Sequence, residues 1–133
     1  IDNTMYMLRD VPFITCDIRE HTSVSEGGVS YVVYTLKLSV PRDMFRRATH
    51  EVAHRYSEFH TLNETMAKRW GKQVDLPKFP GKRISIRSLT DRQVEERRVL
   101  LEEYMQLLLQ RINWSAEENV RTFLQADLWL KPR

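Results

Sequence analysis

The sequence predicts an α+β domain in which a three-stranded antiparallel β-meander packs against a helical subdomain. Residues 1–55 are rich in β-branched and aromatic side chains that alternate with polar ones, a pattern typical of half-buried strands. The remaining residues carry apolar side chains at helical spacing and two helix capping boxes. Because 133 residues suffice to bury one hydrophobic core, we expect residues 1–133 to form a single domain.

Three strands are predicted in the first half of the chain. Residues 13–20 form the first strand, and residues 21–30, which are polar and contain two adjacent glycines, form a turn. Residues 29–40 form the second strand, because they are β-branched and aromatic and alternate with polar residues towards their end. Pro41 interrupts this strand, and residues 49–55 then complete the meander.

Three helices are predicted in the second half. The first follows Tyr56, ends at Gly71, and has the apolar residues Phe59, Leu62, Met66 and Trp70 at helical spacing.

Two capping boxes begin the other two helices. Thr90 and Gln93 form the first box, and the long helix that follows has an apolar stripe. The stripe comprises Val94, Leu101, Tyr104, Met105, Leu108 and Ile112. Ser115 and Glu118 belong to a second box, which begins a short helix. The apolar residues of this short helix are Val120, Phe123 and Leu124. We expect these stripes to pack in the core.

The charge of the chain is concentrated in one segment. The net charge is +3, but residues 68–98 hold ten basic and four acidic side chains and therefore carry +6. Such a segment indicates an anionic partner, either a nucleic acid or a membrane, or else a solvated loop. No apolar run approaches the roughly 18 residues that span a bilayer, and the first residues do not resemble a signal peptide. The single cysteine, Cys16, is predicted to be a buried thiol in a reducing compartment.

The stretch from His50 to His60 admits two interpretations. His50, Glu51 and His54 match the His-Glu-x-x-His motif of a zinc metalloprotease helix, with His60 placed as a third ligand. The longer form of this motif has a glycine where this chain has Ser57, and strand-like sequence precedes it. We therefore favour the second interpretation, in which a strand turns into a helix here, and we expect no metal site.

A proline pair marks the segment between the first two helices. Pro77 and Pro80 have a fixed φ that favours a polyproline II loop, which would hold Lys78 and Lys82 on a stiff arm. The same pattern also fits a ligand of an SH3-type domain. The residues that follow alternate in polarity among arginines, so they form either a short strand or a loop that enters a bilayer. The candidate membrane-insertion residues are Ile84, Ile86 and Leu89.

Three blocks of sequence resemble those of the PX (phox-homology) domain of sorting nexins and related membrane-trafficking proteins. The blocks are Arg55-Tyr56-Ser57-Glu58-Phe59, then Leu76-Pro77-x-x-Pro80-x-Lys82, and then Glu95-Glu96-Arg97-Arg98-x-x-Leu101-x-x-Tyr104. They occur in the family's order and at compatible spacing, and the resemblance extends to Val120-Arg121-x-Phe123-Leu124. The resemblance implies a three-stranded meander followed by helices, which agrees with the patterns described above.

The resemblance also implies a role for each residue of a phosphoinositide site. Arg55 would grip the 3-phosphate, because a planar guanidinium can hold two phosphate oxygens. Tyr56 would form the floor beneath the inositol ring, and Lys82 would meet the 1-phosphate. Arg97 would bond the 4- and 5-hydroxyls, with Arg98 as the competing candidate. Where many members have a basic residue before the Arg-Tyr pair, this chain has His54, which would weaken the positive field.

By this resemblance the domain is a phosphoinositide-binding, membrane-targeting module without catalytic activity, cofactor or nucleic-acid partner. Its expected ligand is phosphatidylinositol 3-phosphate in an anionic membrane, and its expected location is cytoplasmic, peripheral on endosomal membranes. Protein partners would bind through neighbouring regions. The alternative is a protein-interaction PX domain with negligible lipid affinity.

Overall fold

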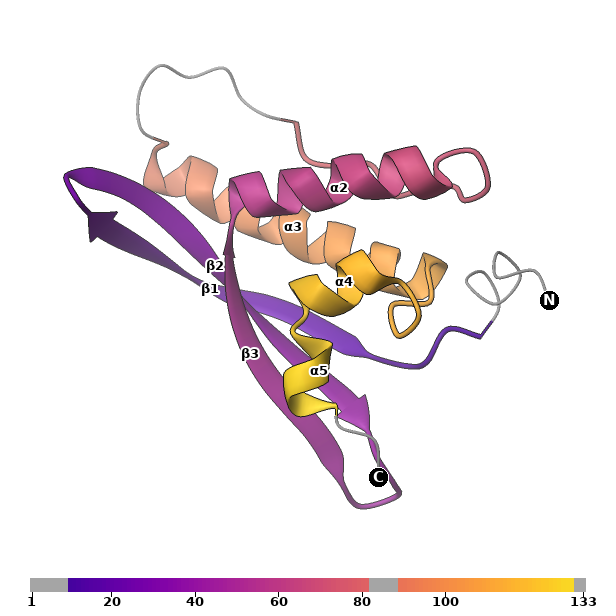
Figure 1. The fold of residues 1–133 in the computed structure, drawn as a ribbon. Helices are drawn as coiled ribbons and strands as arrows, with labels where there is room; N and C mark the ends of the chain where they lie inside the picture. The colour runs from indigo at the N-terminus through magenta and orange to yellow at the C-terminus, as the bar shows by residue number, and fades with distance from the viewer. Residues whose placement is uncertain (1–9, 82–88, 131–133) are drawn as a thin grey trace.

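The computed structural model describes residues 10–81 and 89–130, and it confirms the predicted α+β fold. The sheet consists of β1 (Thr15–Glu26), β2 (Val29–Pro41) and β3 (Arg47–Arg55). The helices are α2 (Tyr56–Trp70), α3 (Asp91–Arg111), α4 (Glu118–Phe123) and α5 (Ala126–Trp129). The strands lie in the order β1-β2-β3 and both pairs are antiparallel, which is the predicted meander (Figure 1).

The first hairpin is longer than predicted. Residues 21–30 were expected to form a turn, but β1 runs to Glu26 and pairs with the start of β2. Only Gly27 and Gly28 turn the chain, and their φ angles of 58° and 80° favour glycine at both positions. Both faces of this end of the hairpin are largely exposed, so its strand residues can be polar. The strands pair here through backbone hydrogen bonds, which do not depend on apolar side chains, and the turn prediction was wrong for this reason.

Other strand ends differ slightly from the prediction. β1 begins at Thr15, two residues later than predicted, and β3 begins at Arg47, two residues earlier. β2 extends to Pro41, which pairs with Arg47 at the end of the sheet. A proline is tolerated at this terminal position because the ladder needs few further donors there.

The two long helices begin and end close to the predicted residues. α2 ends at Trp70, and Gly71 is its C-cap. The hydroxyl of Thr90 accepts a hydrogen bond from the backbone of Gln93 at 3.2 Å, and the Gln93 side chain accepts one from the backbone of Thr90 at 2.9 Å. This reciprocal pair is the predicted capping box, and it fixes where α3 begins.

The start of the short helix was predicted incorrectly. Its N-cap is Glu117 rather than Ser115, because the buried Glu117 carboxylate accepts the backbone N–H of Asn119 at 3.0 Å. The Ser115 hydroxyl instead bonds to Asn113 within the preceding turn. Serine is a favoured N-cap residue and glutamate is not, so the sequence pointed to Ser115. The final helix, α5, was not predicted.

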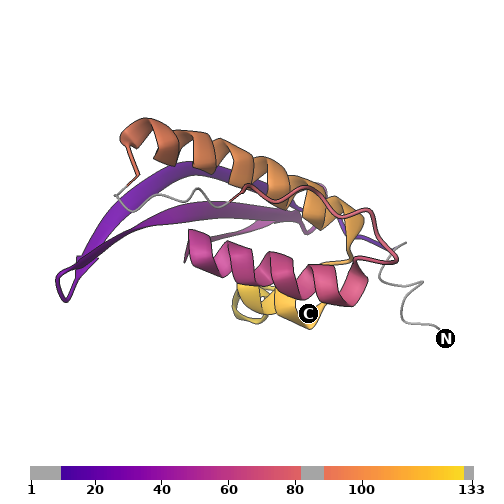
Figure 2. The same ribbon diagram turned by 90° about the horizontal axis from the view of Figure 1, so that it is seen from above.

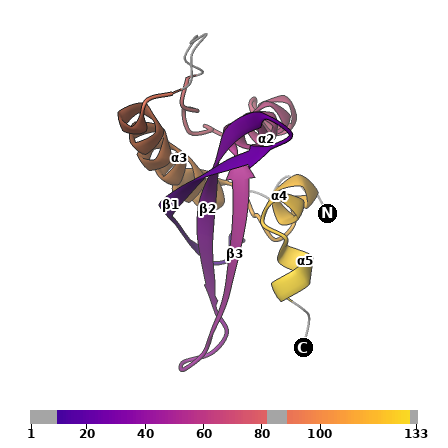
Figure 3. The same cartoon turned by 90° about the vertical axis from the view of Figure 1, so that its left-hand side faces the viewer.

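The helices lie beside the two outer strands of the sheet, β1 and β3. α3 packs along β1, whereas α2 and α5 contact β3 (Figures 2 and 3). The predicted apolar stripes of α2 and α3 are all buried between these layers. Cys16 is 2% exposed, and burial raises the pKa of its thiol, as expected for a structural cysteine. The core therefore fixes the ends of β3, α2 and α3 relative to one another.

Candidate functional site

A cavity of about 330 Å³ opens where three parts of the fold meet. These are the glycine-turn end of the β1–β2 hairpin, the junction of β3 with α2, and the first turns of α3. Its lining residues are Ser23, Ser30, Tyr31, Val32, Tyr34, Arg55, Tyr56, Ser57, Leu89, Asp91, Val94 and Arg97. The structure thus brings the adjacent residues Arg55 and Tyr56 to one pocket with Arg97, which lies much later in the sequence.

Arg55 lies at the point where strand becomes helix. It is the last residue of β3 and the N-cap of α2, and its backbone N–H donates to the Glu58 carboxylate at 2.8 Å. Its guanidinium carbon lies 4.0 Å from the centre of the Tyr31 ring, in a cation–π contact. No carboxylate of the described residues forms an ion pair with Arg55. Its positive charge is therefore held in the pocket without an anionic partner from that part of the chain.

Arg97 forms the second charged wall of the pocket. Its guanidinium carbon lies 3.9 Å from the centre of the Tyr56 ring. The Tyr56 hydroxyl donates to the Pro80 carbonyl at 2.7 Å, which ties this ring to the proline arm. Burial raises the pKa of Tyr56, and the positive charge of Arg97 partly offsets the rise. Both arginines of the pocket thus rest on tyrosine rings.

Tyr34 supplies a polar group at the pocket wall. Its side chain is 1% exposed, and its hydroxyl has no hydrogen-bond partner in the described residues. Burial raises the pKa of Tyr34, and Arg97 partly offsets this rise without completing a hydrogen bond of good geometry. A buried hydroxyl without a partner costs about 1–3 kcal/mol, so a polar ligand that reached it would recover that cost.

Arg98 lies outside the pocket and has a structural role. Its Nε donates to the Glu95 carboxylate at 2.9 Å, and another of its N–H groups donates to the backbone carbonyl of Ile18 on β1. Hydrogen bonding to Glu95 raises the pKa of Arg98, so the pair is stabilised in its charged form. Adjacent positions on a helix point in different directions, which explains why Arg97 lines the pocket and Arg98 holds β1.

Of the other predicted site residues, the structure describes only Leu89. Lys82, Ile84 and Ile86 lie outside the described residues. Leu89 is half-buried, packs against the core and lines the pocket. It therefore contributes to the pocket wall rather than to an exposed apolar tip, and this differs from its predicted place among the membrane-insertion residues.

His54 does not face the pocket. Side chains alternate along β3, so His54 and Arg55 point to opposite faces of the sheet. The His54 ring stacks on Phe123 with centroids 3.8 Å apart, and its Nε2 bonds to the Phe123 carbonyl at 2.6 Å. His54 is therefore not among the lining residues of the pocket, and its effect on the electrostatic field at the binding residues stays a prediction.

The helical zinc interpretation is also wrong. His50 and His54 lie on β3, where residues four apart are separated by about 13 Å rather than by one helical turn. His50 bonds to the Gln125 side chain at 2.8 Å, and His60 pairs with Glu64 at 2.7 Å. The part of the chain that the structure describes holds no group of three His, Cys, Asp or Glu residues arranged for a metal ion.

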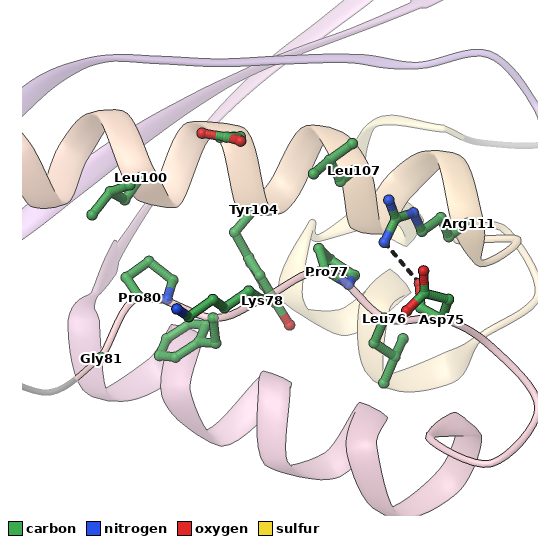
Figure 4. Close-up of a pocket in the computed structure, with 12 residues that line it drawn as sticks. Asp75, Leu76, Pro77, Lys78, Pro80, Gly81, Leu100, Tyr104, Leu107 and Arg111 are labelled. Atoms are coloured by element: carbon green, nitrogen blue, oxygen red, sulfur yellow. Dashed lines mark hydrogen bonds between the residues drawn. The ribbon is translucent and has the colours of Figure 1, made fainter.

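The proline arm, residues 75–81, forms one wall of a second cavity of about 590 Å³ against α3 (Figure 4). Figure 4 shows Tyr104 reaching from α3 towards the arm, and Arg111 donates to the Asp75 carbonyl at 2.7 Å. No helix or strand forms in the arm, and its polyproline II conformation stays a prediction. Pro77 is buried, so the arm does not present both prolines to an SH3-type domain.

Sequence reasoning missed several residues of the pocket. Tyr31 supports Arg55, and Asp91 adds a carboxylate to the cavity, but neither belongs to the motifs quoted above. The signal for Asp91 was its place beside the Thr90 capping box, which was interpreted only as a helix start.

Two exposed apolar residues outside the pocket were also not singled out from the sequence. Met44 and Phe45, in the β2–β3 turn, are 89% and 91% exposed.

Comparison with known proteins decides the family. The sequence model of the PX domain matches residues 42–127. The chain belongs to the PX domain family. Human sorting nexin-17 is 35% identical over 109 residues, which cover 80% of this chain and 20% of that protein. Bovine sorting nexin-11 is 30% identical over 116 residues, which cover 86% of this chain and 42% of that protein.

Solved PX structures share the fold. A designed CISK PX domain superposes with a TM-score of 0.71 at 26% identity, covering 84% of this chain and 99% of that one. The mouse SNX19 PX domain, solved with a bound sulphate ion, gives a TM-score of 0.62 at 25% identity, covering 85% and 97%.

The chain spans about a fifth of the length of the sorting nexin-17 relatives, so it matches one region of those proteins. PX domains generally bind phosphoinositides, and sorting nexins are generally non-enzymatic, peripheral proteins of membrane trafficking. Among the described residues, the helices are all too short or too polar to cross a bilayer.

Proposed function

We propose that this PX domain binds phosphatidylinositol 3-phosphate and so targets its protein to the cytoplasmic face of endosomal membranes. The observation that carries the proposal is the convergence of Arg55, Tyr56 and Arg97 on one pocket, where Arg55 lacks an acidic partner among the described residues. A cation held in this way is available to an anionic ligand.

Arg55 binds the 3-phosphate in this proposal. Its guanidinium can donate two parallel hydrogen bonds to phosphate oxygens, and a charged hydrogen bond contributes about 1.5–3 kcal/mol. The first turn of α2 lies beside it, since Tyr56 and Ser57 also line the pocket. The free N–H groups and the dipole at a helix start favour an anion at the same place.

The inositol ring lies on Tyr56, with Arg97 at its 4- and 5-hydroxyls. Because the guanidinium carbon of Arg97 lies 3.9 Å from the centre of the Tyr56 ring, the guanidinium must shift for the inositol ring to use that face of the tyrosine. A cation–π contact of this kind contributes only about 0.5–1 kcal/mol at an exposed site, so a phosphorylated ring can displace it. The hydroxyl of Tyr34 is a further hydrogen-bonding group for the ligand.

The proline arm delivers the remaining contacts. The Tyr56–Pro80 and Arg111–Asp75 hydrogen bonds hold its two ends. They thereby fix the position of the chain up to Gly81. Lys82 follows directly and meets the 1-phosphate, while Ile84 and Ile86 enter the bilayer beside it. The basic charge of residues 68–98 speeds arrival at an anionic surface, and salt screens that contribution.

The decisive experiment is sedimentation with liposomes that each carry one phosphoinositide isomer in an otherwise identical neutral lipid mixture. We expect phosphatidylinositol 3-phosphate to give the strongest binding, and liposomes without phosphoinositide to give little. Arg92→Ala is a matched control, because Arg92 is an α3 arginine whose side chain is 90% exposed and lies outside the pocket. Absence of binding to every isomer would instead favour a PX domain that binds only proteins.

A further inference from the structure

One acidic side chain lies in the pocket among the cations. Asp91 is the first residue of α3, and it lines the same cavity as Arg55 and Arg97. Asp91, Val94 and Arg97 are spaced three residues apart, so they share the face of α3 that forms the pocket wall. Asp91 and Arg97 are about 9 Å apart along the helix axis, so a ring that lies between them can contact both side chains.

The Asp91 carboxylate has no side-chain partner among the described residues. The other carboxylates in the first two turns of α3 are paired, Glu95 with Arg98 and Glu96 with Arg92. Asp91 has no ion pair or side-chain hydrogen bond with any described residue, and it is exposed to the cavity. A carboxylate is acceptor-only when ionised, so its natural partners in a ligand are hydroxyl donors.

We propose that Asp91 is a specificity residue of the pocket, which accepts hydrogen bonds from free ring hydroxyls and repels a second phosphate. The inference rests on the proposed inositol-phosphate function. A ring hydroxyl can donate to the carboxylate, whereas a phosphate at the same carbon brings a like charge of up to two units close to it. The pocket therefore selects a ring with one phosphate at Arg55 and unmodified hydroxyls between Arg97 and Asp91, where Arg97 donates to them and Asp91 accepts from them.

A purely structural role for Asp91 makes a different prediction. Acidic residues in the first turn stabilise a helix through its dipole, and Asp91 satisfies that pattern too. Loss of that contribution lowers the melting temperature slightly but does not change which headgroup the folded domain prefers. The ratio of affinities for two headgroups therefore separates the two roles.

The test uses isothermal titration of the purified domain with soluble, short-chain phosphatidylinositol 3-phosphate and phosphatidylinositol 3,5-bisphosphate. We expect the wild type to prefer the monophosphate, and Asp91→Asn to reduce that preference about tenfold, mainly through tighter binding of the bisphosphate. Asp91→Ser provides a second variant that removes the charge. Glu103→Gln is the matched control, because Glu103 is an α3 carboxylate that lines the other cavity.

The outcomes are distinguishable. If the wild type binds neither headgroup, the proposed function fails. If the wild type binds the monophosphate and both Asp91 variants keep its preference, the assignment of Asp91 is overturned while the proposed function stands. If Glu103→Gln shifts the preference as much as Asp91→Asn does, general surface charge sets the selectivity, and the assignment is likewise overturned.

Discussion

Charged side chains in two regions of this PX domain have opposite environments. In the pocket, Arg55 and Arg97 rest on tyrosine rings, and no described carboxylate pairs with Arg55. At the junction of α2 and α4, the carboxylate of Glu117 is fully buried but accepts hydrogen bonds from Trp70, Asn119 and Arg69. Exposed charge without a partner marks a place where a ligand can bind, whereas buried charge with several partners marks a structural joint.

The balance at Glu117 shows how the joint is stabilised. Burial alone would raise the pKa of this carboxyl, but hydrogen bonds from Trp70 and Asn119 and the charge of Arg69 lower it overall. The ionised form is therefore the one that the fold holds. The same contacts join α2 to α4 and make Glu117 the N-cap of α4.

The largest expected effect is on stability, at the structural joint. Glu117→Ala removes the acceptor of the Trp70 indole, which donates at 2.8 Å, and of two groups of Asn119. The buried Trp70 indole N–H left without a partner costs about 1–3 kcal/mol, and loss of the N-cap of α4 costs about 1 kcal/mol more, so we expect a total loss of about 3 kcal/mol. Denaturant unfolding followed by tryptophan fluorescence measures this change. Glu118→Ala, at the neighbouring exposed carboxylate, should change stability little; an equal loss there would contradict the structural role of Glu117.

The next largest effect is expected on binding, at Arg55. Arg55→Ala should weaken binding to liposomes with phosphatidylinositol 3-phosphate by about 10- to 150-fold, since a charged hydrogen bond contributes about 1.5–3 kcal/mol. The melting temperature should stay near that of the wild type, because the Arg55 side chain forms no ion pair in the described structure. Unchanged lipid binding, or loss of cooperative melting, would show that Arg55 is a structural residue after all.

Two adjacent arginines sharpen the comparison within a single helix turn. Arg97→Ala should weaken lipid binding about tenfold with little loss of stability, because Arg97 lines the pocket. Arg98→Ala should lower stability by about 1 kcal/mol, because it breaks bonds to Glu95 and to the Ile18 carbonyl, and should change lipid binding less. Parallel titration and thermal melting of the two variants measure both quantities. The reverse pattern would assign the pocket to Arg98.

The smallest expected effect concerns membrane insertion. Ile84→Ser combined with Ile86→Ser should weaken liposome binding severalfold, because partial burial of each side chain in lipid contributes a part of about 1.5–3 kcal/mol. Affinity for soluble phosphatidylinositol 3-phosphate should stay nearly the same, since the headgroup pocket is intact. Added salt should weaken the variant more than the parent, because only the electrostatic part of its membrane binding remains. An equal loss for soluble lipid would instead make these residues part of the core or pocket wall.

The sequence by itself determined the local elements and the family. Alternation predicted the meander, and helical spacing with the Thr90 capping box predicted α2 and α3, because these signals depend on neighbours in the chain. The motifs alone identified Arg55, Tyr56 and Arg97 as candidate site residues. The start of α4 was missed because the carboxylate of Glu117 caps it instead of the Ser115 hydroxyl. That carboxylate is held in place by Trp70, which is distant in the sequence.

Only the tertiary structure decided which side of an element each side chain faces. It placed His54 against Phe123 and Arg55 in the pocket, and it turned Arg97 to the pocket and Arg98 to β1. It also placed Tyr31, Tyr34 and Asp91 beside these motif residues. Such choices depend on packing between segments that are distant in the sequence, because the twist of the sheet and the position of α3 set which faces meet.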